Sequence, residues 1–154
     1  MLHVALFEPE IPPNTGNIMR LCANTGCPLH LVEPLGFSID DRSLRRAGLD
    51  YRDFAQVHTY ANIDALLSAL PHANVWTLST RGTRGYADAN FGDGDLLLFG
   101  PETRGLPQDL IDRIGAQRCL RIPMREDSRS LNLSNAAALV LYEGLRQQGF
   151  PDIA

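Results

Sequence analysis

Short apolar runs alternate with segments of helical periodicity along the whole chain, and this alternation restricts the possible folds more than any other feature. Several runs, such as LHVALF and DLLLFG, are apolar without alternation, which is typical of strands buried on both faces. We therefore expect an α/β fold with a mostly parallel sheet flanked by helices. The predicted strands are Leu2–Phe7, His30–Val32, Gln56–Tyr60, Asn74–Thr80, Asp95–Gly100 and Gln117–Pro123.

Helices are predicted between these strands. The first begins with Asn14 or Thr15 as its cap and ends at Gly26. Apolar residues at helical spacing predict another over Ile63–Leu70, and a short one follows at Gln108–Ile114. The stretch RGTRGYADANFGDG, between two strands, is expected to be a glycine-rich loop.

Length and composition indicate one domain over residues 1–154, with 44% hydrophobic and 21% charged residues. No apolar run reaches the ~20 residues of a membrane span, and the N-terminus is expected to be a strand rather than a signal peptide. The three cysteines, Cys22, Cys27 and Cys119, match no common zinc or redox spacing. We expect buried thiols, no metal and a cytoplasmic protein.

The net charge of −4 argues against a protein that coats nucleic acid by bulk electrostatics. All 14 basic residues are nevertheless arginines. Codon bias in a GC-rich genome explains that choice, but local clusters can still bind a phosphate backbone. The clusters are Arg42, Arg45, Arg46 and Arg52, followed by Arg118, Arg121, Arg125 and Arg129. Arg42, Arg45 and Arg46 of the first cluster lie in the polar stretch 36–51, which predicts a short helix capped by Asp40 or Asp41 and an exposed binding surface.

Three loops at predicted strand ends are rich in glycine and polar residues: Ser79–Gly85, Gly100–Pro107 and Pro123–Asn135. In a parallel sheet, ligands bind where loops leave the carboxyl ends of the strands. Gly100 lies at such an end, where a missing side chain would let a ligand approach the backbone. Leu106 replaces the lysine of a P-loop, and no G-x-G-x-x-G follows a strand, so ATPase and Rossmann sites are disfavoured. The four scattered histidines, His3, His30, His58 and His72, are expected to be structural.

The loop from Ile122 to Asn135 leads into a predicted helix, Ser134–Gln147, with Ser134 and Asn135 as natural caps. Its polar side chains could hold a ligand, and its arginines could hold an anion. An ordinary solvated connection is the alternative. The candidates are Ser128, Ser130 and Asn132, with Arg125 and Arg129.

Three motifs in order make the pattern specific: N-T-G-N-I-x-R at Asn14–Arg20, L-L-F-G-P-E-T-R-G-L-P at Leu97–Pro107, and I-P-M-x-x-x-S-R-S-L-N-L-S-N-A at Ile122–Ala136. This set resembles the motifs of the SPOUT superfamily of knotted methyltransferases. From Leu2 to beyond Phe150, the chain is most similar to the small single-domain branch that 2'-O-methylates the wobble nucleotide of leucine tRNAs.

The resemblance implies a single SPOUT domain with a C-terminal trefoil knot, which periodicity does not predict. It also implies that the knotted loops bind S-adenosylmethionine, largely through backbone groups, and release S-adenosylhomocysteine. By motif match, the cofactor-binding residues are Leu78, Gly100, Ile122 and Ser130, with Glu102, Met124 and Leu131 close by.

For catalysis, the resemblance assigns to Arg20 the stabilisation of the oxyanion that develops on the ribose, with Asn17 and Asn135 in support. A solvated helix face or a salt bridge is the alternative for Arg20. Arg129 and Tyr142 match positions on the RNA side, although a tyrosine such as Tyr142 is more often a core or interface residue. Arg42 and Arg46 complete the predicted RNA-binding set.

The resemblance implies a homodimer, and the apolar run at Leu139–Leu141 agrees because it covers more than one helix face. The expected partners are tRNA and a second copy of the chain, with neither DNA nor membrane. The expected function is methylation of the wobble nucleotide, C or U. Two alternatives stay open: another tRNA position or ribosomal RNA as target, or a catalytically silent RNA-binding module.

Overall fold

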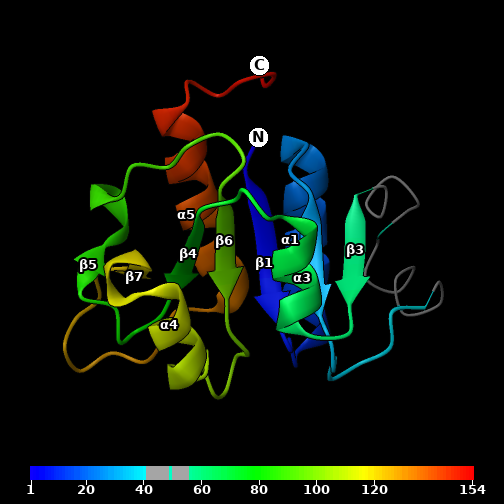
Figure 1. Ribbon diagram of the computed structural model, residues 1–154, viewed down its shortest axis with the longest axis horizontal. Coiled ribbons are helices and arrows are strands. Elements are labelled where there is room, and N and C mark those ends of the chain that lie inside the picture. The colour runs from blue at the N-terminus through cyan, green and yellow to red at the C-terminus, as the bar shows by residue number, and fades with distance from the viewer. Residues whose placement is uncertain (41–48, 50–55) are drawn as a thin grey trace.

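The computed structural model describes residues 1–40, 49 and 56–154. The described part of the chain forms one seven-stranded sheet in the order β3-β2-β1-β6-β4-β7-β5, and its neighbouring strands are paired in parallel (Figure 1). The expected parallel sheet is therefore confirmed. The strands are β1 His3–Phe7, β2 Leu29–Val32, β3 Val57–Tyr60, β4 Val75–Leu78, β5 Arg84–Gly85, β6 Leu96–Phe99 and β7 Cys119–Arg121.

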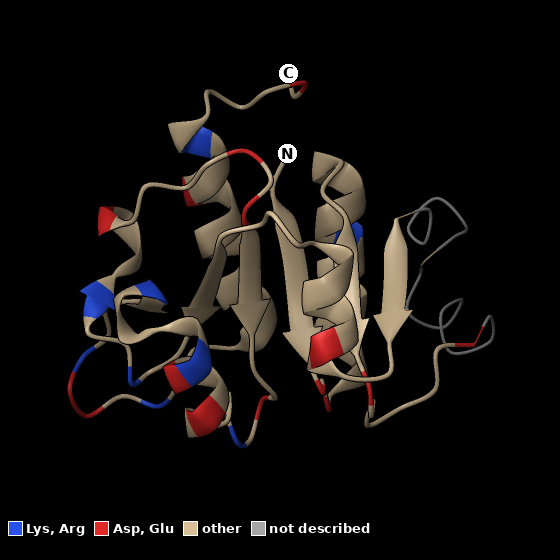
Figure 2. Cartoon of the chain, in the orientation of Figure 1, with Lys and Arg blue, Asp and Glu red and all other residues tan. Residues whose placement is uncertain are grey.

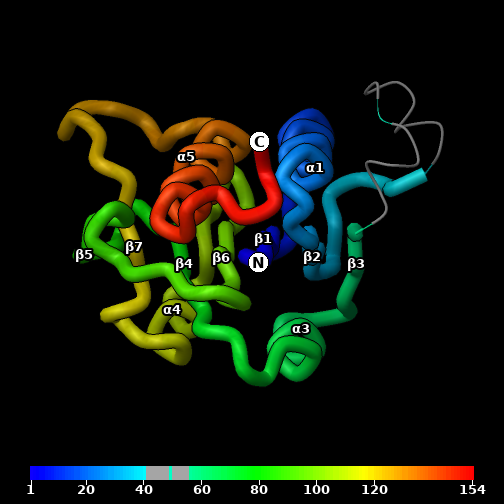
Figure 3. Tube along the Cα trace, turned by 90° about the horizontal axis from the view of Figure 1, so that it is seen from above, coloured from blue at the N-terminus to red at the C-terminus, as the bar shows by residue number. Residues whose placement is uncertain are grey.

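Helices cover both faces of this sheet, which explains why its central strands are continuously apolar. Seen from above, α1 and α5 lie on one side and α3 and α4 on the other (Figure 3). In β1, Leu6 packs into the core on the α1 and α5 side, whereas its neighbour Ala5 packs into the core under α3 and α4. Most residues of the central strands β2, β1, β6 and β4 are thus buried whichever way their side chains point.

Helix α1, Pro12–Thr25, begins earlier than the sequence predicted. Asn14 or Thr15 was expected as the cap, but both are buried inside the helix, and Ile11 is the N-cap. Proline at the first helical positions explains the earlier start, because its fixed φ suits a helix and its missing N–H needs no partner there. The predicted end is confirmed, since Gly26 adopts the left-handed conformation at φ 75°.

Helix α5, Leu133–Gln147, is capped by Asn132 rather than by the predicted Ser134 or Asn135. The Asn132 carboxamide oxygen accepts from the amides of Ser134 at 2.9 Å and Asn135 at 3.2 Å. The predicted caps are therefore the residues whose amides are capped. On the other face, α3 Ile63–Ala69 is capped by Asn62, and α4 has the predicted bounds, Gln108–Ile114.

The glycine-rich stretch after β4 contains the edge strand β5, Arg84–Gly85, and the 3₁₀ turn η2, Tyr86–Asp88, where only a loop was expected. A second 3₁₀ turn, η3 Ala116–Arg118, leads into β7. Gly82 lies in the turn between β4 and β5. A Cβ on Gly82 would lie 2.6 Å from the carbonyl of Leu120, so the turn before β5 runs directly against β7. Backbone contact with β7, rather than an apolar pattern, defines β5.

Three of the four histidines, which were expected to be structural, lie in one polar cluster across β1, β2 and β3. His30 is 3% exposed, and its ring nitrogens lie 2.9 Å from His3 Nδ1 and 2.9 Å from the Tyr60 hydroxyl. His58 stacks on the same ring at 5.5 Å. Burial lowers the pKa of His30 to about 4. The remaining histidine, His72, is exposed.

All three cysteines are buried, as expected, and burial raises the pKa of the Cys22 and Cys27 thiols. Among the described residues, no helix is long and apolar enough to cross a membrane. Acidic and basic residues are interspersed along the loops at the carboxyl ends of the strands (Figure 2). The helix predicted after Asp40, with Arg42 and Arg46, lies outside the described residues.

Candidate functional site

The carboxyl ends of β6, β4 and β7 open onto a cavity of about 440 Å³. This volume lies within the range of small-molecule sites, and the position is the one where parallel sheets bind ligands. The N-terminus of α1 closes one side. The lining comprises Ile11, Asn14, Leu78, Ser79, Thr80, Arg81, Phe99, Gly100, Pro101, Glu102, Thr103, Arg104, Gly105, Ile122, Met124, Ser130, Leu131, Asn132, Leu133 and Ala136.

The structure brings every predicted cofactor-binding residue to this cavity. They come from the ends of three adjacent strands and from the loop that follows β7. The residues are Leu78, Gly100, Glu102, Ile122, Met124, Ser130 and Leu131. The three polar loops predicted from the sequence therefore line one cavity.

The walls combine apolar side chains with a few hydroxyl groups. Leu78, Ile122 and Leu131 offer apolar surface, while Thr80 and Ser130 offer hydrogen-bonding groups. Such a mixture suits a flat ring system with polar edges attached to a polar chain. The adenine and ribose of a nucleoside cofactor fit this description.

Gly100 lines the cavity, but a glycine is required at this position for a different reason from the predicted approach of a ligand. A Cβ there would lie 2.6 Å from the carbonyl carbon of Gly105 and would also collide with the amide of Leu106. The loop after β6 folds back onto its own start, and Gly105 adopts a positive φ of 68° in that turn. Gly100 is therefore needed to let the loop close on itself.

The Glu102 carboxylate also differs from the expectation, because it is largely engaged by the protein. Its Oε1 accepts from the amide of Glu10 at 2.8 Å, and its Oε2 accepts from the amide of Ile11 at 2.7 Å and from Asn14 Nδ2 at 3.2 Å. Glu102 thus supplies the acid at the N-terminus of α1, where an anion is favoured by the helix dipole. It shapes the cavity wall mainly through these contacts.

A chain of side-chain hydrogen bonds continues from Glu102 to the third loop. Asn14 donates to Glu102 and accepts from Asn132 Nδ2 at 3.0 Å. Asn132 in turn caps α5. One network therefore joins residues of the three sequence motifs around the cavity.

Two arginines at the cavity rim already have partners within the protein. Arg81 donates to Gln108 Oε1 at 2.8 Å and to the carbonyl of Leu106. Arg104 forms an ion pair with Glu8 at 3.2 Å. These contacts hold the arginines in the loop framework, which leaves recognition mainly to the walls and backbone.

The predicted catalytic residues lie beside the cavity rather than in it. Asn17 and Arg20 are exposed on α1, and Asn135 is exposed in the first turn of α5. Because positions three apart share a helix face, Asn14, Asn17 and Arg20 form a line leading away from the cavity. With a rise of ~1.5 Å per residue, this line is about 9 Å long. A ribose bound against α1 would lie between the cavity and Arg20.

The predicted RNA-binding residues are more dispersed. Arg129 is exposed in the loop before α5, and Tyr142 is 44% exposed on that helix, with its ring 6.3 Å from that of Phe150. Of the other loop candidates, Ser128 and Arg125 do not appear in the lining of the cavity that the described residues form. Arg125 lies 3.9 Å from Asp127.

Sequence reasoning missed three contributors to the site: Glu10, Thr103 and Arg81. Glu10 and Thr103 join the loops after β1 and β6, and Arg81 anchors the loop after β4. The available signal was that all three follow strand ends, as the predicted loops do. Among the described residues, no group of histidine, cysteine and acidic side chains is placed to hold a metal ion.

Comparison with known proteins gives concordant results. Residues 1–142 match the model of the SpoU rRNA Methylase family. The tRNA (cytidine(34)-2'-O)-methyltransferase of Saccharophagus degradans is 57% identical over 150 residues, covering 97% of each chain. That of Escherichia coli K12 is 54% identical over 151 residues, covering 98% of this chain and 96% of its own.

Solved structures agree. One described as giving structural insights into the 2-OH methylation of C/U34 on tRNA has a TM-score of 0.89 and 45% identity, with 97% of each chain covered. The SpoU methyltransferase AviRb from Streptomyces viridochromogenes, in complex with the cofactor AdoMet, has a TM-score of 0.77 and 27% identity, covering 96% of this chain and 60% of its own. The matching fold, the cavity at the strand ends and this similarity lead to one conclusion: the chain belongs to the SpoU methylase family.

Proposed function

We propose that this protein transfers a methyl group from S-adenosylmethionine to the ribose 2'-hydroxyl of nucleotide 34, C or U, in the tRNA anticodon loop. Full-length similarity to tRNA (cytidine(34)-2'-O)-methyltransferases supports the reaction and its position. The observation that carries the proposal is the cavity, because its walls come from the same loops that carry the family motifs.

The residues present fit the cofactor. Leu78, Ile122 and Leu131 provide apolar surface for an adenine ring, and the cavity-lining Ser130 offers a hydroxyl group to a polar edge. When bound, S-adenosylmethionine supplies an electrophilic methyl group. Methyl transfer converts the ribose hydroxyl to a methyl ether, releases a proton and leaves S-adenosylhomocysteine.

In this reaction the protein mainly places two molecules together. The cavity fixes one, and the exposed face of α1 fixes the ribose, so that the hydroxyl meets the methyl group in line. Arg20 lies on that face and stabilises the charge that develops on the 2'-oxygen. Asn17 and Asn135 orient the ribose from the neighbouring turns of α1 and α5.

The anticodon loop contacts the exposed residues around this face. Arg129 lies in the loop before α5 and Tyr142 in the third turn of that helix, and arginines such as Arg129 pair well with phosphates. Arg42 and Arg46, which lie outside the described residues, complete the proposed RNA-binding set. Leucine tRNAs are the expected substrates, by resemblance to the wobble-modifying branch.

We also infer that the active protein is a homodimer. Leu139 and Tyr142 are 45% and 44% exposed, and with Asn135 they form a stripe along α5. Exposed apolar side chains on one helix face are favourable to pack against a second copy. The stripe begins beside the predicted catalytic residues, so a partner seated there would contribute to the site.

We further propose that residues 1–154 act as one domain in the cytoplasm, with the segment after β7 threaded to make a trefoil knot. Close backbone contacts of Gly82 with Leu120, and of Gly100 with Gly105, support the tight loops that a knot requires. Buried thiols suit a reducing compartment, where tRNA is also found.

Labelling tests this function. The protein is incubated with methyl-labelled S-adenosylmethionine and total tRNA, and the labelled nucleotide is mapped. We expect label on the ribose of nucleotide 34 in leucine tRNAs. Label at another position or in ribosomal RNA would favour a related methyltransferase, and RNA binding without label would favour a silent module.

A further inference from the structure

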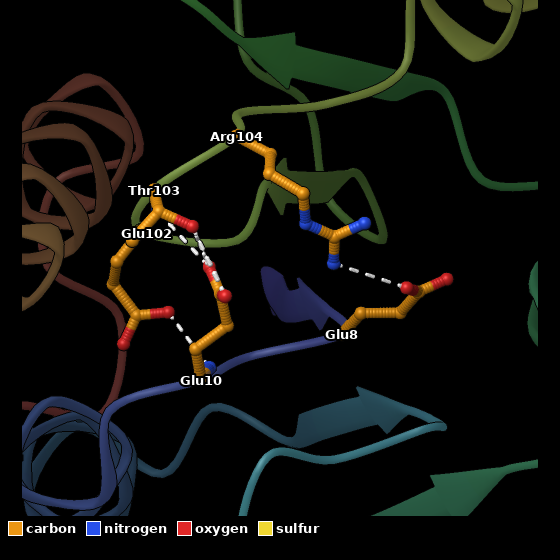
Figure 4. Close-up of polar contacts among 5 residues, drawn as sticks. All are labelled: Glu8, Glu10, Glu102, Thr103 and Arg104. Atoms are coloured by element: carbon orange, nitrogen blue, oxygen red, sulfur yellow. Dashed lines mark hydrogen bonds and ion pairs between the residues drawn. The ribbon is translucent and has the colours of Figure 1, made fainter.

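Two loops beside the cavity, residues 8–11 after β1 and 101–105 after β6, exchange hydrogen bonds through a pair of glutamates (Figure 4). The Glu10 carboxylate accepts from the amide of Thr103 at 3.0 Å and from the Thr103 hydroxyl at 2.7 Å. These hydrogen bonds lower the pKa of Glu10 because they stabilise its charged form. Charge-assisted hydrogen bonds of this kind are stronger than neutral ones.

The exchange is reciprocal. While the Glu10 side chain binds the amide of Thr103, the amide of Glu10 donates to the Glu102 carboxylate at 2.8 Å. Each acid therefore engages the backbone of the other loop. We call the contacts of Glu10 and Glu102 with these loops the glutamate clasp.

One side of the glutamate clasp is supported from behind. A Cβ on Gly36 would lie 2.9 Å from the Cα of Glu10, and the Gly36 amide donates to the carbonyl of Pro9 at 2.9 Å. The 8–11 loop is thus packed against the chain after β2. On the other side, Thr103 and Gly105 are exposed, and in addition to its own Gly105–Pro101 hydrogen bond and the Arg104–Glu8 ion pair, the 101–105 loop depends on the clasp.

This dependence matters because the whole 101–105 loop lines the cavity. We propose that Glu10 is a positioning residue of the cofactor pocket. Its carboxylate holds the 101–105 loop in the conformation that completes the cavity wall. Glu10 itself does not appear among the cavity-lining residues of the described chain, so its effect on a ligand passes through Thr103 and Glu102. The ligand class, S-adenosylmethionine, rests on the proposed function.

Titration calorimetry with S-adenosylmethionine and the purified full-length protein tests the proposal without any RNA. For Glu10→Ala we expect Kd to rise about tenfold or more, the scale of the loss of one charge-assisted contact. Glu10→Gln keeps one acceptor oxygen and should recover part of the affinity. In assays, KM for S-adenosylmethionine should rise while kcat at saturation stays within about twofold, because ground-state placement is what is lost.

Glu8→Ala is the matched control. It removes an acid from the same loop and, among the described residues, breaks the ion pair with Arg104, in which the Arg104 and Glu8 side chains are 58% and 23% exposed. Ion pairs that reach solvent contribute little, so Kd should change by less than about twofold. The double variant Glu10→Ala with Thr103→Val should bind S-adenosylmethionine as tightly as Glu10→Ala alone, because both substitutions remove the same contact.

An unchanged Kd in folded Glu10→Ala would overturn the proposal, as would an equal loss in Glu8→Ala. If Glu10→Ala does not fold, Glu10→Gln and Thr103→Val decide: weakened binding in both supports the clasp, and wild-type binding in both refutes it. The two proposals can fail separately. If the wild-type protein methylates no tRNA but the variants still bind S-adenosylmethionine more weakly, the proposed function is wrong and the role of Glu10 is supported.

Discussion

Asn132 donates a hydrogen bond of 3.0 Å to Asn14, across 118 positions of the chain. The contact joins the cap of α5 to the first turn of α1. Because Asn14 also donates to Glu102, a displacement of either helix start would be felt at the wall of the cavity. The site is therefore held by polar contacts as well as by the core beneath it.

Replacing Asn132 by alanine should lower both stability and cofactor affinity. Loss of the cap costs about 1 kcal/mol of unfolding free energy. Loss of the Asn14 contact should raise Kd for S-adenosylmethionine about tenfold. This change corresponds to ~1.4 kcal/mol of binding free energy, the scale of one hydrogen bond. Urea unfolding and calorimetry measure the two effects.

Asn62→Ala is the control, because Asn62 caps α3 on the other face of the sheet by accepting from the amide of Ala65 at 2.8 Å. A similar loss of stability with unchanged affinity is expected. If both variants weakened binding equally, affinity would follow global stability rather than the Asn14 contact.

The His30 cluster should make the protein less stable in acid. His30 is buried in its neutral form, with a pKa of about 4 against 6.5 for a free histidine. The unfolded chain therefore takes up a proton below pH 6.5 that the folded chain refuses. Stability is complete above that pH and falls as the pH drops towards 4, by up to about 3 kcal/mol for this group.

The test is to measure the unfolding free energy between pH 7 and pH 4. Its slope against pH reports how many more protons the unfolded chain binds than the folded one. His30→Gln removes the titrating group and should flatten the slope, even if its overall stability is lower. His72→Gln, at an exposed histidine, should keep the wild-type slope. Equal slopes in wild type and His30→Gln would place the acid sensitivity elsewhere.

Arg20→Ala should abolish methyl transfer and spare the cofactor. Loss of an oxyanion-stabilising group lowers kcat by about a hundredfold or more. Because Arg20 lies beyond the cavity lining, Kd for S-adenosylmethionine should stay within about twofold of wild type. Single-turnover assays and calorimetry separate the two quantities.

Arg113→Ala serves as its control, since Arg113 is an exposed arginine of α4 paired with Asp64 at 2.5 Å. This variant should methylate normally. Were Arg20→Ala to lose cofactor affinity and transfer to the same degree, the division between the α1 face and the cavity would be wrong.

Leu139→Glu should separate the proposed dimer. A charge on the exposed stripe of α5 would be buried in a packed interface, which is strongly unfavourable. Light scattering should give a mass near twice 17.0 kDa for wild type and near 17.0 kDa for the variant. Ala69→Glu, on α3, should remain dimeric, and a monomeric wild type at micromolar concentration would rule the dimer out.

The parallel sheet could be predicted from sequence because burial on both faces leaves a local signature in β1 and β6. The start of α1 has a local signal in its two prolines, but the acid that stabilises it, Glu102, lies 91 positions from the Ile11 amide that donates to it. Strand β5 has only Arg84 and Gly85 and is defined by its pairing with β7. Local patterns contain no information about such distant partners.

The same division holds for the candidate site. Motif resemblance identified Leu78, Ile122 and Ser130, and the structure places them in one cavity. Resemblance did not indicate that Glu102 is engaged by the backbone of the 8–11 loop, nor that Glu10 returns the contact. Hydrogen bonds between loops depend on how the strands are ordered, and this order comes only from the folded sheet.

The central claim is that the 2'-oxygen of nucleotide 34 receives the methyl group. Its most direct test is a leucine tRNA assembled with a single 2'-deoxy nucleotide, placed at position 34 or, as control, at position 33. Labelled S-adenosylmethionine should methylate the control and leave the 34-deoxy tRNA unlabelled. Methylation of the 34-deoxy tRNA would contradict the account, and so would a failure to methylate the unmodified tRNA.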